Sequence, residues 1–263
     1  MDIRQTAVNA ARKAGALLRE NLGRAGRIEF KGVVDLVTEM DTRSESIIVE
    51  EIKKVFPDHG ILAEEGAELL SNSGRRWVID PLDGTTNYAH GFPWFCVSIA
   101  LEDNGAVVLG VVYNPMLDEL FVAEAGKGAY LNGVKITVSG IDSLDKGLLA
   151  TGFPYDVRSS TENNLDHFGR FAVRAQAIRR AGAAALDLSY VGCGRFDGFW
   201  EMKLRPWDVA AAWLIVREAG GVVTDFKGGP FSIHGRECLA SNALIHRQMV
   251  EVLSKQPGGL SEP

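Results

Sequence analysis

The stretch Trp77-Val-Ile-Asp80-Pro-Leu-Asp83-Gly-Thr-Thr-Asn87 is the part of the sequence from which the fold and the candidate site are predicted. Its apolar start predicts a buried strand that ends at Asp80, and a second acid follows three residues later. An ionised acid is costly where a core strand ends unless it has a partner. Divalent cations such as Mg²⁺ bind carboxylate oxygens and often share a substrate phosphate. Two carboxylates on one stiff turn therefore indicate a metal site.

The residues around Asp83 also indicate an anion site. Pro81 fixes one φ angle, and Gly84 lets a ligand approach the backbone closely. The run after Asp83 predicts a turn into a short helix, whose first N–H groups would face an anion. A structural alternative makes Asp83 a helix cap and Asp80 a turn former, because Asp-x-x-Asp spacing is common. The two acids alone favour that alternative.

Composition narrows the class of protein. The chain has 263 residues, of which 46% are hydrophobic and 24% charged, and a formal net charge of −6. This balance argues against a general binder of nucleic acid or anionic membranes. Residues 2–21 predict an amphipathic helix without the long apolar centre of a signal peptide or a membrane span. An anionic substrate remains compatible, because bound cations can invert the local field.

The cysteines and histidines argue against a zinc site. Cys96, Cys193 and Cys238 are far apart in the chain and odd in number, so we expect buried, reduced thiols and a cytoplasmic location. The five histidines are scattered, and neither Cys-x-x-Cys nor His-x-x-x-His occurs. Oxygen ligands remain for a metal.

The pattern of elements predicts two lobes. Residues 1–139 read as an N-terminal α+β lobe that carries most of the candidate metal ligands, with helices at 2–21 and 42–56, a strand at 61–63, and an antiparallel meander from 96 to 130 with a hairpin at Asn132-Gly133. Strands and helices alternate over residues 140–263, which predicts an α/β lobe. Its strands are expected at 148–151, 175–178, 196–204, 222–224 and 238–240, and its helices at 164–174, 183–191, 209–218 and 244–253. The tail Pro257–Pro263 is expected to fray.

Three further acids lie at predicted element ends. Asp41 stands at the junction of a strand and the helix 42–56, where an N-cap role is favoured. Glu64 and Glu65 follow a strand, so at most one of them can point at the site. Asp208 lies in the first turn of a helix that Pro206 begins, where the helix dipole stabilises an acid. Each acid taken alone favours a structural role.

Several motifs together resemble the inositol monophosphatase family. They are the segment 80–87, Ala63-Glu-Glu65, and Trp207-Asp-Val-Ala followed by Ala219-Gly-Gly221. The similarity to bacterial members includes Asp35-Leu-Val-Thr38 and Gly152-Phe-Pro-Tyr155, and so runs along nearly the whole chain. The resemblance implies a layered αβαβα sandwich of the α+β or α/β class. It also implies two or three Mg²⁺ ions, with Mn²⁺ as a substitute, sensitivity to Li⁺ and a homodimer.

The resemblance also implies roles for individual residues. The first metal would be held by Glu64, Asp80 and the carbonyl of Leu82, and the second by Asp80, Asp83 and Asp208. The attacking water would be oriented or deprotonated by Thr85 paired with Asp41, with Glu64 counted among the catalytic groups. The phosphate would meet the backbone N–H groups of Gly84 and Thr85. The alcohol part would be lined by Gly182, Ala184, Glu201 and Asp208. Ala63 replaces the commoner glycine, and little functional change is expected from it.

These roles predict a phosphatase that needs a metal. Acids gathered without a cation would repel one another and raise their pKa values, whereas two ions can neutralise the phosphoryl oxygens and activate water. Asn87 places myo-inositol monophosphate first as substrate and fructose 1,6-bisphosphate second, with both accepted as a further option. Arg179 and Arg180 could meet a second phosphate, although an exposed surface turn is favoured for them.

Two other classes of function stay open. Some bacterial relatives act as partners of the transcription antitermination machinery, where binding rather than hydrolysis matters. A passive cation-binding protein is the third class, and the phosphate-ready turn at Gly84 and Thr85 disfavours it.

Overall fold

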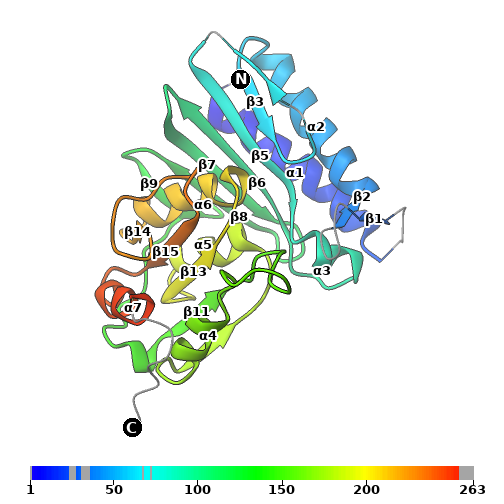
Figure 1. Ribbon diagram of the computed structural model, residues 1–263. Coiled ribbons are helices and arrows are strands. Elements are labelled where there is room, and N and C mark those ends of the chain that lie inside the picture. Colours follow the sequence, from blue (N-terminus) through cyan, green and yellow to red (C-terminus); the bar gives the residue numbers. More distant parts are fainter. Residues whose placement is uncertain (1, 24–27, 31–35, 67, 72, 255–263) are drawn as a thin grey trace.

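Helices and sheets alternate in five layers (Figure 1). The computed structural model describes residues 2–23, 28–30, 36–66, 68–71 and 73–254. Helices α1 (Ile3–Asn21) and α2 (Glu39–Val55) cover one face of an eight-stranded sheet, and α5 (Ala184–Gly192) and α6 (Pro206–Glu218) lie between it and a five-stranded sheet. Helices α4 (Leu165–Ala172) and α7 (His246–Leu253) cover the far side. The predicted αβαβα sandwich is confirmed. The predictions for Asp35 and for the tail Pro257–Pro263 lie outside the described residues.

The eight-stranded sheet contains the predicted meander. Its strand order is β10-β9-β8-β7-β6-β5-β3-β4. The bounds are β3 Gly60–Ala63, β4 Glu68–Leu69, β5 Arg75–Asp83, β6 Cys96–Asp103, β7 Ala106–Asn114, β8 Glu119–Glu124, β9 Gly128–Leu131 and β10 Val134–Lys135. Every pairing is antiparallel except β3 with β5. Asn132 and Gly133, with φ angles of 49° and 80°, form the predicted hairpin turn between β9 and β10.

Strand β5 is buried on both faces, which explains its unbroken apolar run. Trp77 and Ile79 pack in the cluster beneath α1 and α2, and Val78 packs in the cluster around α5 and α6. Alternation across the strand sends these neighbours to opposite faces. The prediction that the strand ends at Asp80 is wrong, because β5 continues to Asp83 with a shift of register between the two acids. Pro81 lies in that shift and has no N–H to give to the ladder.

The five-stranded sheet has the order β12-β11-β13-β15-β14. The bounds are β11 Leu148–Thr151, β12 Ala177–Arg179, β13 Gly198–Met202, β14 Val222–Thr224 and β15 Glu237–Ser241. Strand β11 pairs in parallel with β12 and β13, and β15 pairs in antiparallel with β13 and β14. Each strand and helix predicted for this part of the chain is present within two or three residues of its expected bounds. The division into two lobes stays a prediction.

The middle layer positions the ends of α5 and α6. Every residue of α5 is buried, as expected for a helix enclosed on all sides. Strand β7 approaches α6 closely at Gly110, where an added Cβ would lie 2.4 Å from the carbonyl oxygen of Ala211. The hydroxyl of Ser98 on β6 donates to the carbonyl of Trp207 at 3.2 Å. These contacts hold the first turn of α6, which contains Asp208, against the first sheet.

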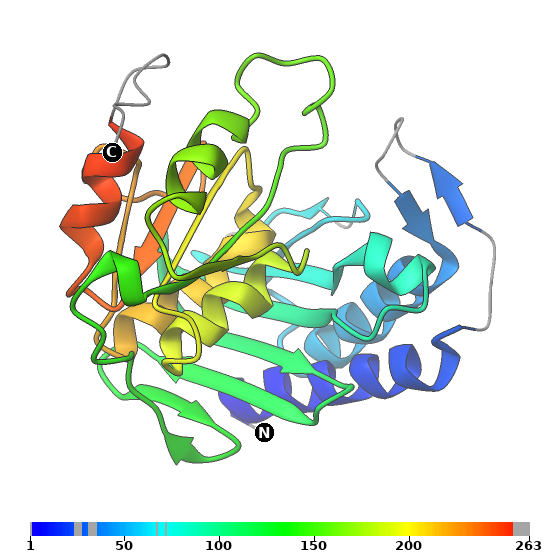
Figure 2. The same cartoon turned by 90° about the horizontal axis from the view of Figure 1, so that it is seen from below.

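The remaining described elements are small. A hairpin joins β1 (Ile28–Phe30) to β2 (Leu36–Thr38), a five-residue helix α3 (Thr85–Ala89) follows β5, and a 3₁₀ turn spans Leu144–Lys146. Figure 2 shows α1 and α2 packed along one side of the first sheet. None of the helices in the described residues has the length and apolar content needed to cross a bilayer.

Candidate active site

Asp80 is the centre of a group of acids of which Asp80 and Asp83 are buried and Glu64 and Asp208 half-buried. Its side chain is 2% exposed and accepts a hydrogen bond from the backbone N–H of Leu82 at 3.0 Å. Burial raises the pKa of Asp80 well above its usual range, and the neighbouring charges of Glu64, Asp83 and Asp208 raise it further. Glu64 follows β3, and its backbone N–H bonds the carbonyl of Ile79 on β5. The four acids that the sequence singled out as metal ligands thus lie within electrostatic reach of one another.

Asp83 joins strand β5 to helix α5. Its two carboxylate oxygens accept hydrogen bonds from the backbone N–H groups of Ala184, at 3.2 Å, and Ala185, at 2.7 Å. The buried thiol of Cys96 donates to the same carboxylate at 3.6 Å. Burial raises the pKa of Asp83 to about 6, while these donors act in the opposite direction. Asp83 therefore does cap a helix, but the helix lies about 100 residues away in the chain.

Asp208 has the structural role that its position favours. Its carboxylate accepts from the backbone N–H of Arg205 at 2.7 Å in a capping box at the start of α6. Burial raises the pKa of Asp208 to about 7, with the bond from Arg205 opposing the shift. The capping role and a site role do not exclude each other, because a carboxylate has about four lone-pair positions.

The donor set suits a hard divalent cation. Buried acids that raise one another's pKa values are stabilised by a cation, and carboxylate and carbonyl oxygens are the ligands that Mg²⁺ prefers. Over the described residues, no three His, Cys, Asp or Glu side chains are already gathered tightly enough to hold a metal ion. The carboxylates would have to turn toward an ion, and the lone pairs not used by backbone N–H groups allow that turn.

Thr85 and Asp41 form the predicted pair. The hydroxyl of Thr85 lies 2.9 Å from a carboxylate oxygen of Asp41 and 3.1 Å from the carbonyl oxygen of Leu82. The prediction that Asp41 lies at a strand–helix junction is wrong, because α2 begins at Glu39 and Asp41 is buried in its first turn. The first turn brings the carboxylate inward, beneath the end of β5.

Gly84 has the backbone geometry that only glycine adopts readily. Its φ angle is +97°, and an added Cβ would lie 3.0 Å from the carbonyl oxygen of Trp94. The next residue, Thr85, begins helix α3, so the first N–H groups of this turn have no carbonyl partner within the helix. The predicted turn into a short helix is confirmed.

The residues assigned to the alcohol part of the substrate come from the segment before α5, the first turn of α5, strand β13 and the first turn of α6. Gly182, with a φ angle of +90°, precedes α5, and Ala184 lies in its first turn. Glu201 on β13 is buried, which raises its pKa to about 8; Arg180 lowers that pKa, and Asp208 and Asp83 raise it. An added Cβ on Gly182 would lie 2.5 Å from Nη1 of Arg180. The guanidinium of Arg180 therefore lies next to Gly182 and close enough to Glu201 to affect its pKa.

Asn87 and Gly152 help to position the site, a role that the sequence did not indicate for either residue. The side-chain amide of Asn87 donates to the carbonyls of Trp94, at 2.7 Å, and Ala181, at 2.9 Å, and so holds the loop before α5. At Gly152 an added Cβ would lie 2.1 Å from a carboxylate oxygen of Glu201. Gly152 belongs to a motif noted above, but nothing in the motif indicates that its missing side chain makes room for Glu201.

Asp187 is a further acid that the sequence analysis missed. It lies in the first turn of α5 with its side chain 1% exposed, and its Oδ1 has no hydrogen-bond partner within the described part of the chain. Burial raises the pKa of Asp187 well above its usual range, followed by the charges of Asp83 and Glu201. A single acid in an otherwise apolar helix was the available signal.

Comparison with known proteins identifies the family. Residues 2–257 match the model of the inositol monophosphatase family. The chain belongs to this family. An inositol-1-monophosphatase from Synechocystis is 46% identical over 255 residues, which cover 96% of this chain and 89% of the relative. The Nus factor SuhB from Escherichia coli is 44% identical over 247 residues, covering 93% of this chain and 92% of SuhB.

A solved structure from the same family has the same fold. The inositol monophosphatase from Anabaena superimposes with a TM-score of 0.88 at 44% identity, covering 97% of this chain and 96% of the other. Members of the inositol monophosphatase family are metal-dependent phosphatases, so this chain is a hydrolase of phosphate monoesters. The family resemblance seen in the motifs is confirmed.

The raised pKa of Glu201 predicts a pH dependence of stability. Between the unfolded pKa near 4.5 and the folded pKa of about 8, the folded state keeps a proton that the unfolded state loses. The free energy of unfolding of the metal-free protein should therefore fall as the pH rises through this window, by up to about 1.4 kcal/mol for each pH unit crossed.

Urea unfolding in EDTA at pH 5.5 and pH 8 checks this prediction against the variant Glu201→Gln. The variant has no proton to lose, so its stability should fall less between the two pH values. Equal losses in both proteins would contradict the assignment.

Proposed function

We propose that this chain hydrolyses myo-inositol monophosphate to inositol and phosphate with Mg²⁺ as cofactor. The observation that carries the proposal is the group of buried and half-buried acids around Asp80, together with the Thr85–Asp41 pair. The names of the Synechocystis and Anabaena relatives support the substrate. Fructose 1,6-bisphosphate is the second candidate substrate of the same site.

The ligands proposed for the metal come from three elements. They are Glu64 after β3, Asp80, Asp83 and the Leu82 carbonyl on β5, and Asp208 on α6. When bound there, Mg²⁺ would neutralise charge on the phosphoryl oxygens and lower the pKa of the attacking water. Two or three ions are proposed, and Mn²⁺ should substitute because it also prefers oxygen ligands.

Thr85 is proposed to orient the attacking water. A threonine hydroxyl has one hydrogen, and a carboxylate has none to donate, so the hydroxyl is the donor to Asp41. With that hydrogen given to Asp41 at 2.9 Å, a lone pair of the Thr85 oxygen is free to accept a hydrogen from water. Asp41 thereby fixes the direction of the hydroxyl. As a proton of the water moves to the Thr85 oxygen, the hydroxyl hydrogen of Thr85 can move to the Asp41 carboxylate, which then holds the proton that the water has lost.

The two ends of the substrate are proposed to meet different parts of the site. The backbone N–H groups of Gly84 and Thr85 face the phosphate. Gly182, Ala184, Glu201 and Asp208 line the alcohol part. Glu201 and Asp208 offer acceptors for hydroxyl groups, and that suits a polyol.

The variant Asp80→Asn tests the proposed function. The asparagine keeps the size of the side chain but removes the charge that the proposed metal ligands share. We expect phosphate release from myo-inositol 1-phosphate to fall to background at saturating Mg²⁺, with an unchanged circular dichroism spectrum. A kcat near that of the wild type would refute the metal assignment.

The variants Thr85→Ala and Asp41→Asn test the role of the water-orienting pair. Groups that move a proton in the transition state contribute roughly 10²–10⁴-fold to the rate, so kcat should fall by about that factor with little change in KM. Thr86→Ala is the matched control, since Thr86 is the exposed neighbouring hydroxyl residue. A rise in KM at constant kcat would contradict the role.

Arg180 and Arg179 offer a test of substrate choice. The charge of Arg180 lowers the pKa of Glu201, so Arg180 lies near the proposed alcohol side. The guanidinium of Arg179 instead donates to the carbonyl of Ile178 at 3.2 Å. If a second phosphate binds on the alcohol side, Arg180→Gln should lower kcat/KM for fructose 1,6-bisphosphate by roughly tenfold or more. Arg179→Gln is the control. Equal effects of Arg180→Gln on the bisphosphate and on myo-inositol 1-phosphate would exclude this contact.

A second function is favoured by one comparison. The Escherichia coli relative is named a Nus factor, which supports the predicted binding role in transcription antitermination. Association with transcription factors that survives Asp80→Asn in a pull-down would support this role. The homodimer, the sensitivity to Li⁺ and the cytoplasmic location stay predictions.

A further inference from the structure

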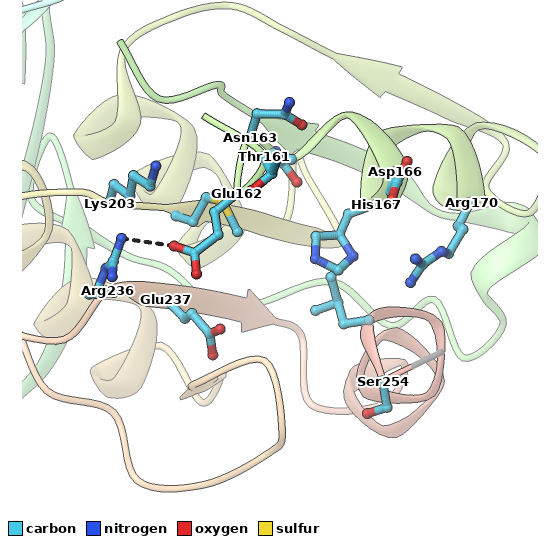
Figure 3. Close-up of a pocket in the computed structure, with 13 residues that line it drawn as sticks. Thr161, Glu162, Asn163, Asp166, His167, Arg170, Lys203, Arg236, Glu237 and Ser254 are labelled. Atoms are coloured by element: carbon cyan, nitrogen blue, oxygen red, sulfur yellow. Dashed lines mark hydrogen bonds and ion pairs between the residues drawn. The ribbon is translucent and has the colours of Figure 1, made fainter. Parts of the chain in front are cut away.

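A pocket lies between α4 and α7, on the far side of the five-stranded sheet. Its volume is about 470 Å³, in the range of small-molecule sites. Its walls come from the loop before α4, α4 itself, the end of β13, the start of β15 and the end of α7 (Figure 3). None of the acids of the candidate active site lines it.

The charged residues of this α4–α7 pocket nearly balance. Three cations, Arg170, Lys203 and Arg236, face three acids, Glu162, Asp166 and Glu237. Arg236 pairs with Glu162 at 3.0 Å, and Lys203 pairs with Asp156 at 2.6 Å. A balanced lining does not suit a ligand with several negative charges. It suits a ligand with at most one negative charge.

Arg170 and His167 provide the hydrogen-bond donors for that charge. They lie three residues apart and therefore on the same face of α4, and Figure 3 shows both side chains directed toward α7. Arg170 is only 8% exposed, and its Nη1 lies 3.5 Å from the carbonyl oxygen of Val252. A buried guanidinium holds carboxylates and phosphates through paired N–H groups.

His167 has a buried ring nitrogen, Nδ1, without a hydrogen-bond partner among the described residues. The edge of the ring packs against Phe226, with 5.4 Å between the ring centroids. Burial and the neighbouring Arg170 lower the pKa of His167. A neutral imidazole has one donor and one acceptor, so it can donate to an anion through its N–H or accept from a hydroxyl through its bare nitrogen.

The rest of the lining offers partners for hydroxyl groups. Thr161, Asn163 and Ser254 supply hydroxyls and an amide, and Glu237 supplies acceptor oxygens. Carboxylates that accept from sugar or polyol hydroxyls need no charge on the ligand. Met202 and Leu253 add limited apolar area for a carbon chain.

The backbone of this pocket is strained at two non-glycine residues. Asn164 has a φ angle of +71° and Lys203 one of +63°. Asn164 is held by its side chain, which donates to the carbonyl of Gly152 at 2.6 Å and accepts from Trp200 Nε1 at 2.8 Å. Backbone in this region persists only where its surroundings enforce it, and such residues cluster at ligand sites.

We propose that the α4–α7 pocket binds a small hydroxylated ligand with one anionic group, a carboxylate or a phosphate. Arg170 and His167 hold the anionic group, and Thr161, Asn163, Ser254 and Glu237 bond the hydroxyls. None of the residues that line this pocket belongs to the proposed hydrolytic site.

Binding of gluconate to the full-length protein in Mg²⁺ tests the proposal, with sorbitol as the uncharged polyol of equal length. Calorimetry measures the affinity, and ¹⁵N amide shifts locate the site. We expect gluconate to shift residues 161–170 and 236–237, and sorbitol to bind at least roughly tenfold more weakly. Sorbitol 6-phosphate, measured on Asp80→Asn so that turnover does not consume it, shows whether phosphate serves as well as carboxylate.

Two variants decide which residues are responsible. Arg170→Met and His167→Phe should each weaken gluconate binding by roughly tenfold, whereas Arg247→Gln, an exposed arginine of α7 that does not line the pocket, and Asp80→Asn should leave it unchanged. If Arg170→Met fails to fold, His167→Phe alone decides. The proposal is overturned if gluconate does not bind at millimolar concentration, if its shifts are confined to residues 80–85 and 180–185, or if sorbitol or the folded pocket variants bind as tightly as gluconate binds the wild type.

Discussion

The bond between Asp83 and the first turn of α5 is the contact on which the site depends. One carboxylate at the end of β5 accepts two backbone N–H groups from a helix of the second half of the chain. A buried carboxylate is costly without such donors. The same bonds therefore stabilise the acid and hold the first turn of the helix next to β5. The carbonyl of Gly182 also lies close to Gly84, 3.3 Å from where an added Cβ would be. Asp80 and Asp208 are held in the same manner, each by one backbone N–H.

This shared arrangement explains why each acid supported two interpretations in the sequence. Asp208 is a capping residue by its bond to Arg205 and a member of the acid group by its effect on the pKa of Asp80. A local pattern can indicate the first role, since capping depends on neighbours in sequence. The second role depends on where the helix lies in space. The structural role and the functional role are therefore two properties of one side chain.

The sequence predicted the elements better than their ends. Apolar runs and helical periodicity located the helices and strands, because burial on one or both faces determines the spacing of apolar residues along the chain. The start of α2 and the end of β5 were misplaced by about three residues. For α2, Asp41 after a predicted strand end suggested the boundary, but the helix begins at Glu39 and Asp41 points inward from its first turn. For β5, Asp80 followed by Pro81 suggested the boundary, but a bulge at Pro81 lets the strand continue to Asp83.

The candidate site was predictable where its residues are adjacent in sequence, as in the segment 80–87. Contacts such as Asn87 with Ala181, or Gly152 with Glu201, join segments that are far apart in the chain. Nothing in the sequence of either segment indicates that the two meet in the fold. The α4–α7 pocket had no signal at all. Its lining is a mixture of common polar residues from five segments that share no pattern in the chain.

The long reach of Asp83 also constrains how the protein can be made. A chain leaving the ribosome presents β5 and its acids before the amide groups of Ala184 and Ala185 exist outside the exit tunnel. Until then Asp83 has no backbone donors from α5, and the inner face of the first sheet lacks the helices that cover it. Native packing of that face must await nearly complete synthesis, because contacts of such long sequence separation form late. Truncation before α6 would leave a product with an uncovered apolar sheet, which is a substrate for chaperones and proteases rather than a smaller working enzyme.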